Sequence, residues 1–204
     1  DIQSAKIPLS LLTAPLKRAP VIEPEASLVD ALWAQLKQAK QPLLWLGGGA
    51  LESGEAVKTL ADAGVTVISS THGRGILADS HRASLRAFHN SPSVEALISQ
   101  CDFTLVAGSR LRSNETRSWT LELPTPRVQI DIDPAAASRN YLMDNTLVAD
   151  CRALLDALAT RVQGRMWGDA RWDSQLKAAV EAAEQGLRDQ CGAYAKLNDA
   201  IAQA

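Results

Sequence analysis

Cysteine is scarce in this sequence, and its three residues, Cys101, Cys151 and Cys191, lie far apart without a Cys-x-x-Cys pair. Such spacing argues against a disulfide framework and against a zinc site. It favours a reducing, cytoplasmic setting. A formal net charge of −2 gives no electrostatic reason to expect nucleic acid or an anionic membrane as a partner. No apolar run approaches the roughly 20 residues of a membrane span, and the opening residues lack the features of a signal peptide.

What the sequence does contain is an alternation of apolar runs and helical patterns. Continuous apolar runs without polar alternation predict strands buried on both faces, as in a parallel sheet. PLLWL at residues 42–46 is such a run, 102–108 is expected to be another buried strand, and further strands are expected at 65–69, 127–132 and 147–150. Helical spacing is expected over 28–40 (with Ser27 as N-cap), 56–63, 92–100 and 151–162. The alternation predicts an α/β fold, a Rossmann-like parallel sheet with helices on both faces.

Changes in composition divide the chain into three parts. Residues 1–26 are rich in proline and are expected to form an inter-domain linker. The strand and helix pattern occupies residues 27–162, and residues 163–204 indicate a further linker and an Ala-rich helix. Because the chain begins at Asp1 without a methionine, we expect it to be a piece of a longer protein.

Five polar or glycine-bearing loops follow the predicted strands. They comprise residues 47–49, 70–75, 108–114, 131–134 and 149–150. Ligands collect at the carboxyl ends of the strands of an open parallel sheet, so these loops are expected to meet at one rim. Their convergence is stronger support for a binding site than any one loop.

Each loop also has a plainer interpretation. Gly47, Gly48 and Gly49 form either a tight turn or a close backbone contact to a phosphate, and they match neither the dinucleotide fingerprint nor the P-loop. His72 and His89 have no metal-ligand spacing and are more consistent with loop ordering, although either could hydrogen-bond a ligand.

The charged residues of the rim raise the same choice. Arg110, Arg112 and Arg117 suit a pyrophosphate or carboxylate, although Arg112 and Arg117 could equally be solvated loop charges. Asp131 could contact a ribose or adenine, and Asp133, which precedes Pro134, is expected to cap the following turn. Without a third ligand, the two carboxylates would make only a weak Mg²⁺ site. No nucleophile and base are paired in a known catalytic motif, so these residues predict a ligand-binding or scaffolding domain.

The order of these motifs resembles the central domain of thiamine-diphosphate-dependent enzymes. The resemblance covers about residues 20–162 and rests on PLLWLGGG, THGRG, LVAGSR, VQIDIDP and VADCRALLDAL. It is nearest to acetolactate synthase, with pyruvate oxidase, benzoylformate decarboxylase and oxalyl-CoA decarboxylase as relatives. It implies a six-stranded parallel sheet and a parent enzyme that decarboxylates or joins 2-keto acids.

The resemblance also implies how the parent would be divided. Its thiamine diphosphate and Mg²⁺ would be held by two other domains of the same chain, the pyrimidine-binding and pyrophosphate-binding domains. Residues 163–204 would lead to the latter. This piece would bind neither group and would be inactive alone, with no catalytic or metal-ligating residue of its own. The parent would be a homodimer or homotetramer, with neither nucleic acid nor membrane as partner.

Flavin-carrying members hold FAD in this domain. The contacts carried over fall on Gly47, Gly48, Gly49, Thr71, His72, Gly73, His89, Gly108, Ser109, Arg110, Asp131, Ile132 and Asp150. Two departures argue against flavin: residues 108–114 read GSRLRSN and lack the two acids of the acetolactate synthase pattern, and Asn90 replaces a glycine. FAD, ADP and no nucleotide therefore remain alternatives. So do a stand-alone module that binds FAD, ADP or NAD and a structural spacer.

Overall fold

The computed structural model describes residues 6, 8 and 20–196, and the expected linker of residues 1–26 lies mostly outside them. Five strands form one sheet: β1 (Pro42–Leu46), β2 (Thr66–Ser69), β3 (Phe103–Ala107), β4 (Arg127–Asp131) and β5 (Asn145–Val148). The α-helices are α2 (Ala26–Leu36), α3 (Gly54–Asp62), α4 (Pro92–Ile98), α5 (Cys151–Ala159) and α6 (Ala170–Cys191). Short 3₁₀ turns occupy η2 (Gly48–Ala50), η3 (Thr71–Gly73) and η4 (Ser113–Glu115). The α/β prediction is confirmed.

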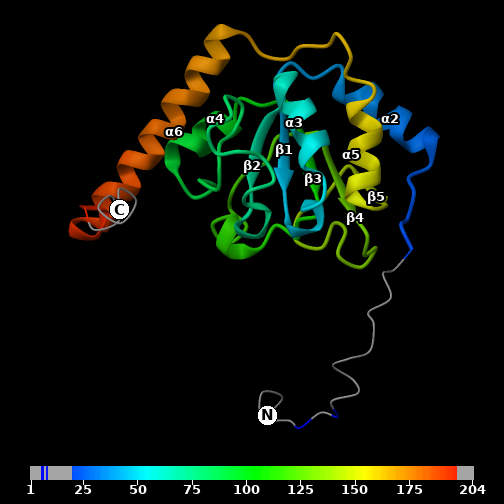
Figure 1. Cartoon of the computed structure of the whole chain (residues 1–204), viewed down its shortest axis with the longest axis horizontal. Coiled ribbons are helices and arrows are strands. Elements are labelled where there is room, and N and C mark those ends of the chain that lie inside the picture. Colours follow the sequence, from blue (N-terminus) through cyan, green and yellow to red (C-terminus); the bar gives the residue numbers. More distant parts are fainter. Residues whose placement is uncertain (1–5, 7, 9–19, 197–204) are drawn as a thin grey trace.

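All strand pairs are parallel, in the order β2-β1-β3-β4-β5 (Figure 1). The chain leaves β1 in one direction to form β2 and later returns to its other side as β3. The point where strand order reverses therefore lies between β1 and β3, where ligands of such sheets bind. A sixth strand was expected, but in its place the structure has one parallel bridge, Val67 to Ser84, beyond β2.

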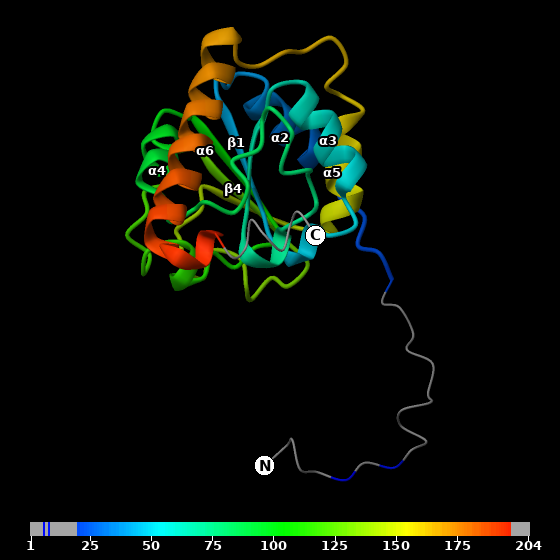
Figure 2. The same cartoon turned by 60° about the vertical axis from the view of Figure 1, so that its left-hand side comes forward.

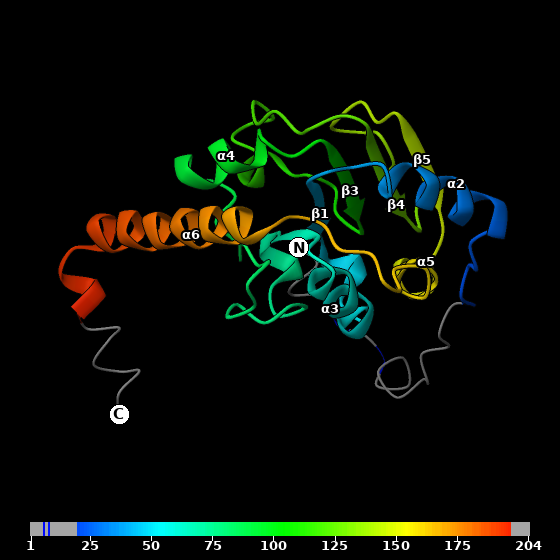
Figure 3. The ribbon, with the colours of Figure 1, turned by 90° about the horizontal axis from the view of Figure 1, so that it is seen from above.

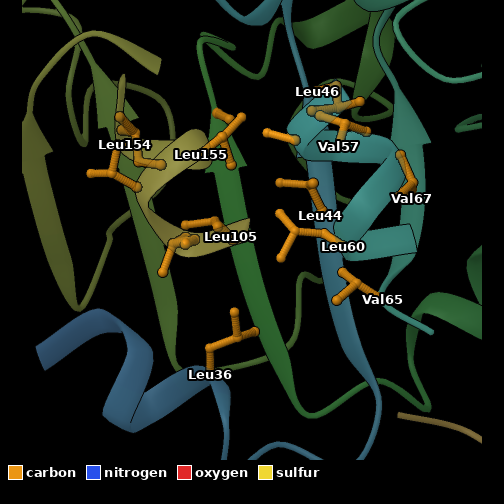
Figure 4. Packing of buried hydrophobic residues seen from close by; sticks show 14 of the residues in the cluster. Leu36, Leu44, Leu46, Val57, Leu60, Val65, Val67, Leu105, Leu154 and Leu155 are labelled. Carbon is orange, nitrogen blue, oxygen red and sulfur yellow. The ribbon is translucent and has the colours of Figure 1, made fainter. Parts of the chain in front are cut away.

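The central strands are buried on both faces because helices cover both. All five residues of β1 are buried, and their side chains alternate between two apolar clusters. Leu44 and Leu46 lie among the side chains of α3 and α5, and Figure 4 shows them beside Val57 and Leu60 of α3. Leu43 and Trp45 join the opposite cluster, beneath α4 and α6. Figure 3 shows these two layers from above.

Several predicted boundaries were wrong by a few residues. Helix α2 begins after Glu25, and Ser27 lies inside it. It ends at Leu36, and the carboxylate of Asp102 accepts hydrogen bonds from the backbone N–H groups of Lys40 and Gln41, which holds this stretch in a turn. Strand β5 begins two residues earlier than expected, at Asn145.

The C-terminal helix α6 was expected to lie outside the domain, but it packs onto it. Trp172 is 4% exposed and, together with Leu176 and Val180, forms part of the second apolar cluster. Its indole Nε1 donates a hydrogen bond to Thr66 Oγ1 in β2, with 3.0 Å between the two atoms. Helix α6 runs beside α4 along this face (Figure 2). The apolar core of the described chain therefore extends past residue 162.

Ion pairs fix α6 to the loop that follows β2. Arg82 Nη1 contacts both carboxylate oxygens of Asp173, at 2.9 and 3.0 Å, and Arg86 pairs with Glu184.

In the described part of the chain, no helix is long and apolar enough to cross a membrane.

Candidate functional site

A cavity of about 340 Å³ lies at the carboxyl ends of the strands. These ends form the lower edge of the sheet in Figure 1. Residues from all five predicted rim loops line it, so their convergence is confirmed. The lining consists of Gly47, Gly48, Gly49, Ser70, His72, Gly108, Ser109, Arg110, Arg112, Glu115, Asp131, Ile132, Asp150 and Cys151.

The glycines of this cavity are needed for backbone packing. A Cβ on Gly47 would fall 2.1 Å from the carbonyl oxygen of Gly108, and one on Gly108 would fall 2.5 Å from Gly49 Cα. Gly108 also has a φ of +60°, in the left-handed region that favours glycine. The loops after β1 and β3 therefore pack backbone against backbone, which supports the tight-turn interpretation of these glycines. Gly48 faces His72, with 3.3 Å between its notional Cβ and the His72 Cβ.

The arginines of the rim differ in their partners. Arg110 lies at the cavity, and its Nη2 is 3.8 Å from Asp133 Oδ2. Arg112 also lines the cavity and forms no ion pair among the described residues. Arg117 pairs with Glu95 of α4 and does not line the cavity. Arg112 is therefore the cation of this group best placed to meet an anionic ligand.

Asp131 and Asp133 have separate structural roles. Asp133 Oδ1 accepts a hydrogen bond from Ala135 N at 2.9 Å, which confirms that it orders the turn at Pro134. Asp131 Oδ1 accepts from Asp133 N at 3.0 Å. Asp131 is 8% exposed and lines the cavity, so its carboxylate borders the space available to a ligand.

Asp150 begins α5 as its N-cap. Its Oδ1 accepts hydrogen bonds from Arg152 N at 2.9 Å and Ala153 N at 3.2 Å, which satisfies two of the free N–H groups at the helix start. The side chain also borders the cavity. Its predicted contact with a cofactor stays a prediction beside this capping role.

Three predicted contact residues do not line the cavity: Thr71, Gly73 and His89. Gly73 packs against the backbone of β1, where a Cβ would fall 2.4 Å from the oxygen of Leu46. His89 is 6% exposed, with its ring centroid 6.1 Å from that of Trp45. Burial lowers the pKa of His89, and the charge of Glu115 and a hydrogen bond with the Ser69 backbone only partly oppose this.

Comparison with known proteins decides the family. Residues 29–158 match the family model described as "Thiamine pyrophosphate enzyme, central domain". The chain belongs to this family.

Relatives of this central domain are longer proteins. An acetolactate synthase of Mycobacterium avium is 28% identical over 145 residues, which are 68% of this chain and 23% of that protein. A pyruvate oxidase of Lactiplantibacillus plantarum is 31% identical over 177 residues, 80% of this chain and 29% of that protein. A probable 2-ketoarginine decarboxylase of Pseudomonas aeruginosa is 27% identical over 196 residues, 89% of this chain and 35% of that protein. The chain thus spans about a quarter to a third of these relatives.

A solved structure shows the same fold. It is described as a putative thiamin diphosphate-dependent enzyme from Mycobacterium smegmatis and superposes with a TM-score of 0.57 at 21% identity. The match covers 78% of this chain and 33% of that one.

The sequence did not reveal one residue of this central domain's cavity, Glu115. It is 2% exposed, and its Oε1 accepts a hydrogen bond from Thr71 N at 3.1 Å. It lies within the polar stretch SRLRSNETRS, whose composition is typical of an exposed loop. Its burial follows from left-handed backbone at Leu111 and at residues 117–119, which folds this segment back on itself.

The described residues provide neither a metal cluster nor a reactive thiol at the cavity. They contain no cluster of three or more His, Cys, Asp or Glu that could hold a metal ion. Burial raises the pKa of the Cys151 thiol to about 12, with smaller contributions from Asp131 and Asp150. Since the thiolate is the reactive form, Cys151 is a poor nucleophile at neutral pH.

Proposed function

We propose that this chain is the central domain of a thiamine-diphosphate-dependent enzyme that decarboxylates or joins 2-keto acids. The match of residues 29–158 to the family model is the observation that carries the proposal. The names of its relatives, acetolactate synthase, pyruvate oxidase and probable 2-ketoarginine decarboxylase, support 2-keto acids as the substrate class. The parent would assemble as a homodimer or homotetramer in the cytoplasm.

Within that parent, thiamine diphosphate and Mg²⁺ would be held by two other domains. The described residues provide no group of metal-binding side chains, so we assign no catalytic step to them. The chain would instead serve as the domain that connects the catalytic domains and carries the rim cavity. Thiamine diphosphate, when bound, would supply the electron sink for the 2-keto acid chemistry.

We further propose that the cavity binds the pyrophosphate and adenosine part of FAD or ADP. Its volume of about 340 Å³ is near the lower end of the range of small-molecule sites, roughly 300–1,000 Å³. Arg112 supplies a cation without an acidic partner among the described residues. Asp131 supplies a carboxylate at the end of a strand, where ribose hydroxyls are bound in comparable sheets.

The remaining predicted contacts, which include Ser109 and Ile132, belong to this proposal. The tight backbone packing of Gly47, Gly49 and Gly108 favours the alternative of a spacer domain, because it explains these glycines without a ligand.

Nucleotide binding is tested on the chain itself by thermal unfolding with FAD, ADP and NAD. A nucleotide at 100 times its Kd should stabilise the fold by about 2.7 kcal/mol, which raises Tm by about 5–11 °C for a chain of this length. The Asp131→Ala variant should lose most of that shift. The matched Asp133→Ala variant should keep it, since Asp133 serves the turn. No shift with any nucleotide would support the spacer.

The activity is tested on the full-length parent. With thiamine diphosphate and Mg²⁺, it should release CO₂ from a 2-keto acid such as pyruvate. A parent without thiamine-dependent turnover of any 2-keto acid, whose isolated domain nevertheless binds a nucleotide tightly, would indicate the stand-alone module instead.

A further inference from the structure

One wall of the cavity carries a histidine beside a buried acid. His72 belongs to η3 and Glu115 to η4, and both line the cavity. The distance from His72 Nδ1 to Glu115 Oε1 is 3.9 Å. The side chain of Glu115 is 3% exposed, whereas that of His72 is 59% exposed. The imidazole is therefore accessible from the cavity, whereas the carboxylate beside it is buried.

A buried carboxylate at this place works against an anionic ligand. Removed from water, its charge is poorly screened, so it repels a nearby phosphate more strongly than a surface acid would. Its one described backbone partner, Thr71 N, donates a single hydrogen bond. A proton on His72 would add a positive charge between the two anions. An imidazole can gain that proton near neutral pH.

The other histidines are not placed for this role. His89 is buried beneath the rim, and burial lowers its pKa, so it favours the neutral form. His81 lies outside the cavity: its Nε2 is 3.0 Å from Asp62 Oδ1, and its Nδ1 accepts a hydrogen bond from Ala83 N. Of the three histidines of the sequence, only His72 lines the cavity.

The charged groups that share the cavity with His72 come from four segments of the chain. Glu115 and Arg112 come from the η4 segment, and Arg110 comes from the loop after β3. Asp131 ends β4 and Asp150 begins α5. With His72 neutral, three acids face two arginines, and Arg110 is already close to Asp133 outside the lining. With His72 neutral, the acids of the lining therefore outnumber its arginines, and a proton on His72 would restore the balance of charge that a pyrophosphate needs.

We propose that His72 and Glu115 form a proton-linked phosphate subsite, in which His72 takes up a proton from solvent when a pyrophosphate binds and bridges it to Glu115. This inference rests on the proposed nucleotide site. In it, Glu115 is a positioning residue that holds the protonated imidazole. His72 is the group that contacts the ligand.

Isothermal titration calorimetry of the chain with FAD and with ADP, in buffers of different ionisation enthalpy, measures the proton uptake. Wild type should take up to about one proton more per nucleotide at pH 7 than the His72→Asn variant. The difference between the two proteins cancels any titration of the ligand's own phosphate. Because up to about one proton is bound together with the nucleotide, binding should be about tenfold weaker at pH 8 than at pH 6. The His81→Asn variant is the matched control and should behave as wild type.

The Glu115→Gln variant separates positioning from a purely structural role. It keeps an oxygen for Thr71 N but removes the charge, so binding at pH 8 should become a few-fold tighter and its pH dependence should flatten. Equal weakening at every pH would mean that Glu115 only supports the fold, and would overturn the inference. Nucleotide binding without His72-dependent proton uptake would overturn it as well, leaving the nucleotide site intact. If neither nucleotide binds the wild type, the nucleotide site and the inference both fail.

Discussion

Removal of the Trp172 side chain should strongly destabilise the domain. Trp172 is 4% exposed, lies in the apolar cluster between α6 and the sheet, and donates to Thr66 in β2. Truncation of a buried tryptophan to alanine costs about 3–5 kcal/mol of unfolding free energy. For a chain of this length, each kcal/mol lowers Tm by about 2–4 °C, so a decrease of about 6–20 °C is expected.

A second variant divides this effect into packing and hydrogen bonding. Trp172→Phe keeps most of the apolar contact but leaves the fully buried Thr66 hydroxyl without its donor. An unsatisfied buried polar group costs about 1–3 kcal/mol, so this variant should fall between wild type and Trp172→Ala. Tyr194→Ala is the matched control, because Tyr194 is an aromatic residue near the same end of the chain and is 78% exposed. Its effect should stay within about 0.5 kcal/mol.

Urea unfolding followed by far-ultraviolet circular dichroism is the suitable assay, because tryptophan fluorescence would change with the substitution itself. If Trp172→Ala changes the unfolding free energy by no more than the Tyr194 control does, α6 is not part of the cooperative core. Residues from 163 onward would then be the linker and helix that the sequence predicts.

Three further predictions concern the rim and the buried titratable groups. Gly108→Ala should destabilise the chain by more than about 2 kcal/mol in the same urea assay, because the methyl group would meet the backbone of Gly49. Gly75→Ala is the control: its φ of +85° is similarly left-handed, but a methyl group there would meet open space. It should cost only about 1–2 kcal/mol. The pKa of His89 is lowered in the folded state, so its contribution to stability is complete above about pH 6.5 and is lost as the pH falls toward the folded pKa. The unfolding free energy should therefore depend less on pH between 7 and 5 in His89→Gln than in wild type. An unchanged pH dependence would contradict this. A thiol reagent at pH 8 should modify the exposed Cys191 rapidly. It should modify Cys101 and Cys151, which are buried and have a pKa of about 12, only when the chain unfolds. Fast reaction of all three thiols in the native chain would refute the burial of Cys101 and Cys151.

Much of the fold follows from local pattern. The run PLLWL is apolar at every position and FTLVA at every position but Thr104, a pattern that suits strands covered on both faces, and both form central strands. Ser91 and Pro92 begin α4 as expected, since proline suits the first turn of a helix. The role of α6 was missed because an Ala-rich, charged helix shows only a narrow apolar stripe, and nothing local tells whether that stripe meets a core.

The candidate site divides in the same way. The five rim loops could be predicted because parallel strands place their carboxyl ends at one edge. The structural roles of Asp133 and Asp150 depend on neighbours two or three residues away. Glu115 could not be predicted, because its burial depends on a backbone reversal and on contact with Thr71, 44 residues away.

The sequence alone therefore determined the parallel sheet, the loops that meet at its rim and the resemblance to the central domain of thiamine-diphosphate enzymes. Each depends on short-range order: the period of apolar residues, the position of glycines and the sequence of motifs. Only the tertiary structure decided that α6 covers one face, that the rim glycines pack against each other, and that Glu115 is buried beside His72. These features arise between segments far apart in the chain, where packing and exclusion of water, not local preference, set the environment of each side chain.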